Sequence, residues 1–433
     1  MNERKDKFVL GIFFSFLAIF LYCSSILYSY FAIDMDIIAN ILIFLGIISL
    51  AIYLYFSFKI KKFKIWNIII LFIFFFLYLS YYFAFDKYVA LRGFYGGREG
   101  LFVIFTYYLL FLLATMFKKS TERNFFLILI TVLGIFNVIY GVLQVLDIYY
   151  IGSLPVARNW SVSSGFLFNP DFFGTFMIIL VGLWLPKFLL SNKFKVLNLL
   201  ILLIFVLGVF ISGTMGSFLT LIFLFFLSII YTLYRRKAFN KKIILFKYFL
   251  VGISSFTLFL LVTLITNDNL KADILNMGVE FSGVVTGNVK GEFGTGRIYI
   301  WKEALKYFPK YIYTGIGIDN FAYLGFDDNT FIYDSYLEDN VVYKAHNEFL
   351  QILVTEGIFT FIFYLIFLLL IIVISFKKLS SLSLSRENQI LCLFFTFIGY
   401  LFQAIFNIRI ILIAPIFFVL SGFLVADVTN EKE

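Results

Sequence analysis

The sequence has little charge, a single histidine and only two cysteines. Asp, Glu, Lys and Arg make up 14% of its 433 residues, against about a quarter in soluble globular domains. Cys23 and Cys392 both lie in apolar runs, so they indicate neither a disulfide framework nor a metal-binding motif. This scarcity of charge excludes an ordinary soluble domain.

Apolar side chains dominate what is present. Hydrophobic residues make up 62% of the chain and aromatic residues 22%, and long apolar runs recur. Uninterrupted runs of roughly 17–25 apolar residues are typical of membrane-spanning helices, and they lack the alternation of a transmembrane β-barrel. We therefore predict an all-α polytopic membrane protein with about twelve spans. The predicted spans are residues 8–33, 37–58, 65–85, 100–117, 125–147, 170–190, 196–212, 215–234, 244–266, 347–376, 387–408 and 410–427.

Basic residues predict the orientation of these spans. Short connectors rich in Lys and Arg follow every second span: "KIKKFK", "KKSTER", "SNKFK", "YRRKAFNKK" and "FKKLSSLSLSRE". Because such loops stay in the cytoplasm, we predict a multi-pass protein of the inner (cytoplasmic) membrane with a cytoplasmic N-terminus. No small-residue cleavage site follows Arg4, Lys5 and Lys7, so we expect an uncleaved first span. The net charge of +9 reflects this topology and indicates no nucleic-acid partner.

One loop is long enough to fold by itself. The predicted segments are 1–266 (transmembrane helices 1–9), 267–346 (a large extracytoplasmic loop with short helices) and 347–433 (transmembrane helices 10–12). Within the loop, Ile298, Trp301, Leu305 and Phe308 recur at helical spacing, and Pro309 ends the run. This pattern predicts an amphipathic helix that lies on the membrane surface.

Ionisable residues near the spans gather toward one side of the membrane. They are Asp147, Asp171, Glu348, Glu356 and Arg409. Charges inside a membrane bundle are costly and usually functional, and a transporter is expected to place them near the midplane. Under the predicted topology all of them belong to the outer half, which favours a site that opens outward to a lipid-anchored or external substrate.

His346 is the only imidazole of the chain and stands where the large loop enters the tenth span. An imidazole is the natural general base at neutral pH, and the neighbouring carboxylate of Glu348 would raise its pKa. The alternative interpretation is an interfacial histidine that merely caps the helix together with Asn347.

Arginines on the predicted outer side are candidate anion ligands. Arg297 lies in "GEFGTGRIYIW", where glycines allow close backbone approach and a guanidinium can bind phosphate with two nitrogens. Arg98, in "FYGGREG", and Arg409, in "FNIRIILIAP", are similarly placed. The alternatives are a glycine-rich turn that starts a surface helix, for Arg297, and arginines that snorkel to the headgroups, for the other two.

An acidic stretch in the loop is the candidate cation site. It contains Asp319, Asp327, Asp328, Asp334, Glu338 and Asp339. Calcium or magnesium binding is conceivable, but the spacing matches no known ligand loop. A solvated acidic loop is favoured, and no metal site is predicted.

Several motifs together resemble those of a known family. "GTGRIYIWKEAL", "GIGIDNF" and "AHNEFLQILVTEGIFTFIFYLIFLL" occur in this order after the large loop begins. They resemble the O-antigen ligase and O-antigen polymerase family of bacterial envelope glycosyltransferases. "GGREGL", "GFLFNPDFFGTF" and "AIFNIRIILIAPIFFVLSG" also resemble members of this family. The resemblance covers most of the chain from about residue 90, and its second half is the specific part.

The resemblance implies a reaction and roles for residues. Such enzymes transfer a glycan from an undecaprenyl diphosphate carrier to an acceptor hydroxyl on the outer face of the cytoplasmic membrane, without a metal or other cofactor. It implies that His346 is the general base and that Arg297 binds the diphosphate. The substrate-binding residues expected besides these two are Arg98, Arg409, Asn347, Glu348 and Asp171.

Two positions depart from the family pattern. Met215 stands where the family often has an arginine, so Arg98 or Arg409 would have to supply a second positive charge at the diphosphate. Asp171 stands where asparagine is frequent. The mechanism we expect is direct displacement at the anomeric carbon with inversion.

The predicted function is that of an O-antigen ligase-like glycosyltransferase, and three other functions stay open. The same chemistry serves a polymerase of lipid-linked repeat units and a protein O-oligosaccharyltransferase. A flippase or other transporter of lipid-linked glycans would need no chemistry, but the one-sided charges count against it, and one histidine offers no proton relay. The expected partners are the undecaprenyl-diphosphate-linked donor, a glycan or lipid-linked acceptor, and membrane lipids.

Overall fold

The structure is a computed structural model, and it describes most of the chain. The described residues are 2–31, 33–60, 65–95, 97–117, 121–146, 162–191, 194–235, 240–265, 279, 282–283, 286–287, 296–324, 342–379 and 384–429. Some residues weighed above lie outside these ranges: Asp147 and, in the acidic stretch, Asp327, Asp328, Asp334, Glu338 and Asp339.

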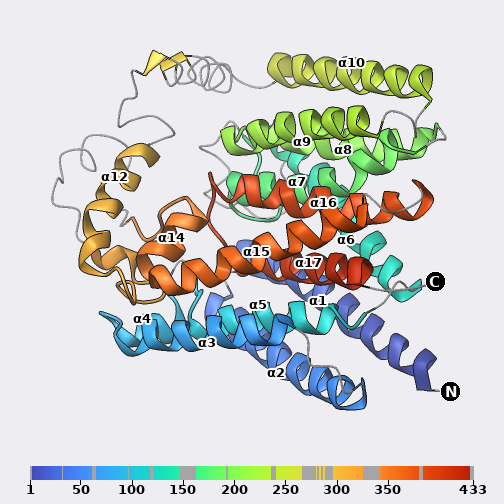
Figure 1. Ribbon diagram of the computed structural model, residues 1–433. Coiled ribbons are helices and arrows are strands. Elements are labelled where there is room, and N and C mark those ends of the chain that lie inside the picture. The colour runs from blue at the N-terminus through green and yellow to red at the C-terminus, as the bar shows by residue number, and fades with distance from the viewer. Residues whose placement is uncertain are drawn as a thin grey trace.

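Helices make up all the regular structure of the described residues (Figure 1). The first half contains α1 (Asn2–Phe31), α2 (Met35–Ile60), α3 (Ile65–Tyr82), α4 (Lys87–Arg92), α5 (Leu101–Ala114), α6 (Thr121–Val145), α7 (Pro170–Leu189), α8 (Val196–Ser212), α9 (Met215–Tyr234) and α10 (Lys241–Ile265). The second half contains α12 (Arg297–Tyr307), the 3-10 helices η3 (Phe308–Lys310) and η4 (Phe321–Leu324), α14 (Glu348–Thr355), α15 (Gly357–Leu379), α16 (Leu384–Gln403) and α17 (Ala414–Thr429).

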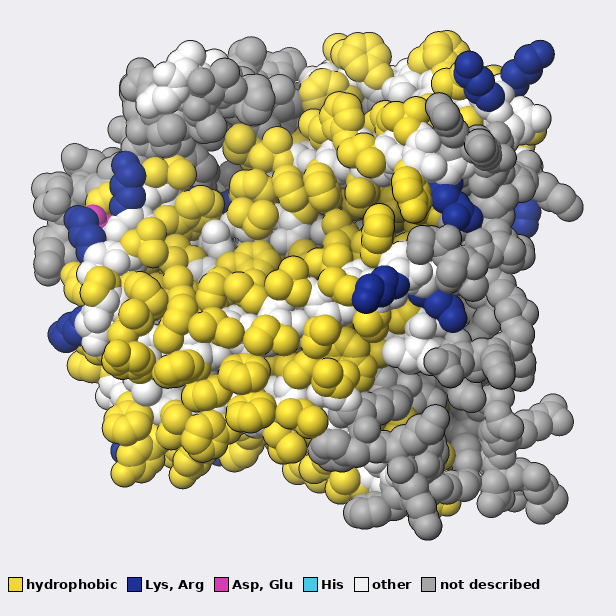
Figure 2. All heavy atoms as spheres, viewed as in Figure 1, with side chains coloured by type: hydrophobic (Ala, Val, Ile, Leu, Met, Phe, Trp, Pro, Cys, Tyr) yellow, Lys and Arg dark blue, Asp and Glu magenta, His cyan; other side chains and the backbone are white. Residues whose placement is uncertain are grey.

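The helices confirm the predicted class. Within the described ranges, eight helices are long and apolar enough to cross a membrane. Four shorter apolar helices occupy the remaining predicted spans: Leu101–Ala114, Val196–Ser212, Asn388–Gln403 and Ala414–Thr429. Figure 2 shows a broad hydrophobic face with Lys and Arg side chains mainly toward its two ends, as expected for a bundle surrounded by lipid. The chain is thus an all-α polytopic membrane protein.

The tenth predicted span differs from the prediction because it is two helices. α14 ends before Glu356, and α15 begins at Gly357 with φ +86°. A Cβ at Gly357 would lie 2.4 Å from the carbonyl oxygen of Tyr313, so only glycine allows this close approach. The amide of Ile316 donates to the carbonyl of Val354 at 3.0 Å. The break is therefore the place where the loop segment docks onto the bundle.

The predicted loop helix is present as α12, and its buried side agrees with the predicted stripe only in part: Trp301 and Phe308 pack against a small core. Leu305 is 49% exposed, whereas Ile300 and Ala304 are buried. These two residues belong to that core together with residues from the docked loop and α14. Because one face of α12 packs against protein, the residues that it buries are set by the neighbouring elements as well as by its amphipathic pattern.

Three helices form the interior of the bundle. α7 packs against α8 and α16, and α17 packs against α5; most side chains of α5, α7 and α17 are buried. α5 has 14 residues and α17 has 16, hence lengths of about 21 and 24 Å, against a hydrocarbon thickness of about 30 Å. Non-helical backbone at such depth is tolerated where protein covers it. The segments before these two short helices contribute Glu99 and Arg409 to the buried charges of the site.

Candidate active site at the loop end of the bundle

The predicted site residues gather at one end of the bundle. α4, α12 and α14 lie at this end, whereas the start of α1 and the end of α17 lie at the other (Figure 1). We call it the loop end. Elements from distant parts of the sequence meet here, so the site depends on the packing of the whole bundle.

Arg297 connects α12, α7 and the turn that contains Phe406. It is the first residue of α12, directly after Gly296 at φ +82°. Its Nη2 lies 2.7 Å from Oδ2 of Asp171, and its Nη1 donates to the carbonyl of Phe406 at 2.7 Å. Asp171 is in the first turn of α7, whose N-cap is the side chain of Asn169. Arg297 and Asp171 are 14% and 19% exposed in their side chains, so the pair lies at the edge of the interior.

His346 lies beside this pair, and one of its ring nitrogens has no hydrogen-bond partner within the described part of the chain. Trp301 of α12 donates its Nε1–H to the carbonyl of Ala345 at 2.8 Å, which fixes α12 against the residue before the histidine. The Nδ1 atom of His346 is buried without a hydrogen-bond partner. Burial, followed by the positive charge of Arg297, lowers the pKa of His346 from 6.5 to about 4, and the carboxylate of Asp171 opposes this shift. The imidazole is therefore neutral at neutral pH.

Glu348 does not raise the pKa of the histidine, contrary to the expectation from sequence. Its carboxylate accepts hydrogen bonds from the hydroxyls of Tyr364 at 2.7 Å and Tyr400 at 3.0 Å, deep in the bundle. Its backbone amide donates to the carbonyl of Ala404 at 2.8 Å. Glu348 thus ties the start of α14 to α15 and α16.

The backbone around His346 is held from both sides. The amide of Ala345 donates to Oε1 of Gln351 at 2.8 Å, and the Asn347 side chain accepts from the amide of Leu350 at 3.0 Å as the N-cap of α14. His346 itself has φ +50°, a strained conformation for a non-glycine residue that surrounding contacts must impose. The contacts on either side of His346 supply that constraint.

Backbone strain is concentrated in the loops of this end. Among the described residues, four other than glycine have positive φ, and all four adjoin the contacts described here: Arg98, Phe168, Asp319 and His346. Such strain typically costs about 1–3 kcal/mol per residue and clusters at functional sites. Its distribution therefore marks the same region as the side chains do.

A buried ionic network lies next to the histidine. Nζ of Lys344 lies 2.6 Å from Oδ1 of Asp319 and 3.0 Å from Oε2 of Glu99. Arg409 lies between Glu99 and Glu356, with its Nη2 2.9 Å from Oε1 of Glu356. Burial alone lowers the pKa of Lys344, but the carboxylates of Asp319 and Glu99 outweigh it and raise the pKa above the ordinary value. We call Lys344, Glu99, Asp319, Arg409 and Glu356 the ionic network.

Sequence reasoning missed part of this network. Glu99 lies within the motif "GGREGL", and Lys344 directly precedes the motif that begins "AHNEF". The sequence shows that both residues are charged but does not show that they pair. The two residues are 245 positions apart. No local pattern indicates such a pairing.

The two arginines proposed to replace Met215 are both held by carboxylates. Arg98 pairs with Asp36 of α2 at 2.8 Å, and Arg409 belongs to the ionic network. Met215 itself is the first residue of α9, and a Cβ on the next residue, Gly216, would lie 2.8 Å from the Cβ of Phe406. The turn before α9 therefore lies beside the residue whose carbonyl accepts from Arg297.

Polar side chains that the sequence did not single out hold α7 against α16 and α9 beneath the Arg297–Asp171 pair. Asn407 donates to the carbonyl of Asp171 at 2.8 Å and to Oγ1 of Thr175 at 2.6 Å. Gln403 donates to Oγ of Ser217 at 3.1 Å. These buried amides fix the position of Asp171 relative to the turn that contains Phe406.

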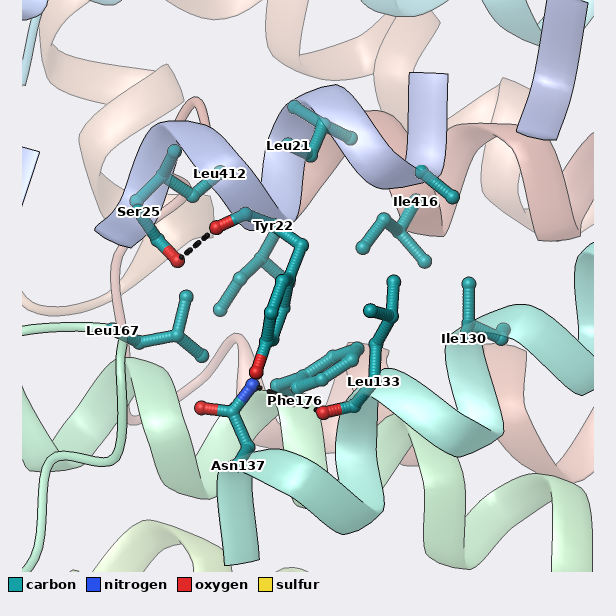
Figure 3. A pocket seen from close by; sticks show the side chains of 12 residues that line it. Leu21, Tyr22, Ser25, Ile130, Leu133, Asn137, Leu167, Phe176, Leu412 and Ile416 are labelled. Carbon is teal, nitrogen blue, oxygen red and sulfur yellow. Dashed lines mark hydrogen bonds between the residues drawn. The ribbon is translucent and has the colours of Figure 1, made fainter. Parts of the chain in front are cut away.

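A pocket opens between α1, α6 and α7, separate from the charged groups (Figure 3). The side chains of Tyr22, Leu133 and Phe176 point toward its centre in Figure 3. The remaining lining residues are Ala18, Leu21, Ser25, Ile130, Asn137, Leu167, Leu412, Ile413 and Ile416. This lining is mostly apolar.

Metal coordination has no candidate in the part of the chain that the structure describes. Over those residues, no three His, Cys, Asp or Glu side chains are grouped so that they could hold an ion.

These features define a class: a polytopic helical membrane protein with a neutral imidazole and an arginine at one end of the bundle. Residues 199–365 match the family model of the O-antigen ligase. The matched segment contains Arg297, His346 and the break between α14 and α15, and the family it matches is the one that the motifs resemble. The match supports a membrane protein of the ligase or polymerase type. No curated protein matches the sequence.

Proposed function

We propose that the protein is a glycosyltransferase that moves a glycan from an undecaprenyl diphosphate carrier to an acceptor hydroxyl. The observation that supports this most is that the only imidazole of the chain and Arg297 meet at one site, within the segment that matches the O-antigen ligase family. These are the two groups that the reaction needs: a base for the acceptor and a positive charge for the leaving group.

Arg297 is the residue that binds the diphosphate in this proposal. A guanidinium binds phosphate oxygens with two parallel N–H groups. Negative charge grows on the diphosphate as the bond to the sugar breaks, and a preorganised donor at that position typically contributes about 3 kcal/mol. Arg297 is suited to this because α12, α7 and the Phe406 turn hold it in place.

His346 is the base. As neutral imidazole it accepts the proton of the acceptor hydroxyl while the oxygen attacks the anomeric carbon from the side opposite the diphosphate. The sugar is transferred with inversion, and undecaprenyl diphosphate leaves. A positioned base typically accelerates such a step by about 10²–10⁴-fold.

Of the other predicted substrate ligands, Arg98, Arg409, Asn347 and Glu348 each contact a partner within the protein. These contacts favour a role in positioning the site. Asp171 is different because its partner is Arg297 itself.

The proposed location is the cytoplasmic membrane, with the N-terminus in the cytoplasm and the loop end outside. The basic connectors of the sequence favour this orientation. A donor anchored by its lipid then stays in the bilayer, while its sugar reaches the acceptor at the surface.

A polymerase that joins lipid-linked repeat units is the second candidate, because the same family match and the same two residues serve it. The two functions differ in the acceptor. A protein O-oligosaccharyltransferase would use a third acceptor, a hydroxyl group of a protein. The protein reconstituted in lipid nanodiscs should be given a lipid-linked glycan with a lipid-oligosaccharide acceptor, with no second acceptor, or with a hydroxyl-containing peptide.

Gel sizing of the products tests the proposal. Transfer to the lipid-oligosaccharide supports a ligase, a ladder formed from the donor alone supports a polymerase, and a modified peptide supports the third function. Folded protein that binds the donor and forms no product with any acceptor would overturn the proposed transfer reaction and favour a transporter.

A further inference from the structure

Nδ1 of His346 and Nε of Arg297 are both buried without a hydrogen-bond partner among the described residues, as are Nε of Arg98 and Nε and Nη1 of Arg409 in the neighbouring charged groups. The carboxylate of Asp171 lies close to both His346 and Arg297. It is 2.7 Å from Nη2 of Arg297, and its charge acts on the imidazole. Asp171 has no part in the chemistry proposed above, and its position between the two residues suggests one.

Both terminal nitrogens of Arg297 are occupied by protein. Nη1 donates to a backbone carbonyl, that of Phe406, and this residue is fixed by the bond of its own amide to the carbonyl of Gln403 at 2.9 Å. Nη2 is held by the side chain of Asp171. Each terminal nitrogen has a second N–H, and Nε of Arg297 has no partner among the described residues, so a diphosphate can bind the guanidinium beside these oxygens. Its negative charge then repels the Asp171 carboxylate, which can rotate away, whereas the carbonyl of Phe406 is part of a fixed turn.

We propose that Asp171 is a donor-controlled positioning residue: it holds Arg297 in the free protein, and when a diphosphate takes over the guanidinium, the carboxylate moves to accept a hydrogen bond from Nδ1–H of His346. This inference rests on the proposed function. Repulsion between the phosphate and the carboxylate drives the exchange, and the unpartnered Nδ1 receives the released side chain.

The exchange prepares the histidine for catalysis. A hydrogen bond at Nδ1 fixes the tautomer in which Nε2 carries the free lone pair, and a carboxylate partner makes that nitrogen more basic. The charged groups that face His346 are Arg297 from α12 and Asp171 from α7. Donor binding neutralises the first and brings the second closer, so both changes raise the pKa of His346.

The step balances in protons and electrons. Nε2 of His346 takes the proton of the acceptor hydroxyl, the oxygen forms its bond to the anomeric carbon, and the electron pair of the breaking bond leaves with undecaprenyl diphosphate. The imidazolium that forms is stabilised by Asp171 and returns its proton to solvent. A base that gains strength only after donor binding makes the order of binding donor first, acceptor second.

The single histidine of the chain makes a direct test practical. Protein labelled with ¹³C and ¹⁵N in histidine and placed in nanodiscs gives one imidazole signal, which reports both tautomer and pKa. Spectra would be recorded over pH with and without undecaprenyl diphosphate, for the wild type, Asp171→Asn and Asp171→Glu. In the wild type, the lipid diphosphate should raise the pKa and shift the imidazole to the Nδ1–H tautomer.

Asp171→Asn distinguishes the effect of the carboxylate on His346 from the effect of the ligand's charge. The diphosphate's own charge acts on the histidine in this variant too, so a smaller rise in pKa is expected, without the shift of tautomer. Asp171→Glu should recover part of the tautomer shift. An equal pKa rise and an equal tautomer shift in Asp171→Asn and wild type would overturn the proposal.

Transfer kinetics provide a second readout that a purely structural role would not give. Asp171→Asn removes the competitor for Arg297, so KM for the donor should fall. At the same time kcat should fall by about 10–100-fold, the loss seen when the hydrogen-bond partner of a metal-binding histidine is removed. Asp86, which caps α4 at the same end, provides the matched control: Asp86→Asn should leave both constants unchanged. A rise in KM for Asp171→Asn contradicts the proposed competition.

The failure of this inference differs from failure of the proposed function. If His346→Gln transfers glycan at the wild-type rate, the proposed base is wrong and the inference falls with it. If His346→Gln is inactive but the wild-type imidazole signal keeps its tautomer when undecaprenyl diphosphate binds, only the role of Asp171 is overturned.

Discussion

Two charged regions at the loop end differ in how their charges are matched. Lys344 and Arg409 of the ionic network are at most 6% exposed in their side chains, and each lies between two carboxylates. Arg297, in contrast, is 14% exposed and has one carboxylate partner. His346 is two residues from Lys344 and keeps an unpartnered nitrogen.

The difference indicates that the ionic network positions the site, whereas Arg297 and His346 act on the substrate. Removing a partner from a buried charge is expensive, so Lys344 and Arg409 are committed to the fold and hold the strained segment before and around His346. Arg409 also has unpartnered nitrogens, Nε and Nη1, but its side chain is only 6% exposed. Arg297 and His346 are partly exposed, so a substrate at the surface can reach their unpartnered nitrogens. The comparison therefore predicts that variants of one region change stability and that variants of the other change transfer.

The largest expected effect is on transfer by His346→Gln. An amide can form hydrogen bonds but cannot take the hydroxyl proton, so the rate should fall by about 10²–10⁴-fold, while thermal stability and donor binding remain. The measurement is the transfer assay on purified, folded protein.

His346→Gly offers a control for the same position. Glycine adopts φ +50° without strain, so this variant should fold at least as well as the wild type, and added imidazole should restore part of the rate. Wild-type turnover in either variant would mean that the histidine is only a cap.

The ionic network should show the largest effect on stability. Glu99→Ala leaves Lys344 and Arg409 each short of a partner, and breaking a buried charge pair typically lowers the free energy of unfolding by about 3–5 kcal/mol. Thermal unfolding in detergent measures this loss. Lys87→Ala, which removes an exposed charge, is the control and should stay within about 0.5 kcal/mol of the wild type. Equal melting of the two variants would refute the stabilising role of the network.

Arg297→Ala should be the next largest change in transfer. Loss of one charge stabiliser is expected to raise the barrier by about 2.7–4 kcal/mol, and Arg297→Lys should restore only part of it, since an ammonium cannot bind two oxygens side by side. Lys302 is an exposed cation on the same helix, so Lys302→Ala tests whether any positive charge on α12 suffices. A loss of transfer in Lys302→Ala as large as in Arg297→Ala would contradict the specific role of Arg297.

The smallest effect is expected from acid. The pKa of His346 is lowered to about 4 in the free protein, so the base stays deprotonated as pH falls from 7 to 5. The profile of kcat/KM for the donor, which reports the free enzyme, should therefore be nearly flat over this range and fall only on approach to pH 4. A fall centred near pH 6.5, the ordinary value for imidazole, would show that burial and Arg297 do not act on the working base.

Sequence patterns predicted the membrane class and the two central residues because both are local properties. A run of apolar residues long enough to cross the bilayer is visible without any knowledge of its neighbours. The motifs that carry Arg297 and His346 are likewise continuous in the chain. The break before Gly357 was missed, since an apolar run continues through it and only the docked Tyr313 segment requires it.

The amino-acid sequence by itself determined that this chain is a bundle of apolar helices and where its scarce ionisable groups stand along it. Only the tertiary structure decided which of those groups face one another. Asp171 and Arg297 are 126 positions apart, and Glu99 and Lys344 are 245 apart. The physical reason is that hydropathy acts along each helix separately, whereas the partner of a buried charge depends on how the helices pack.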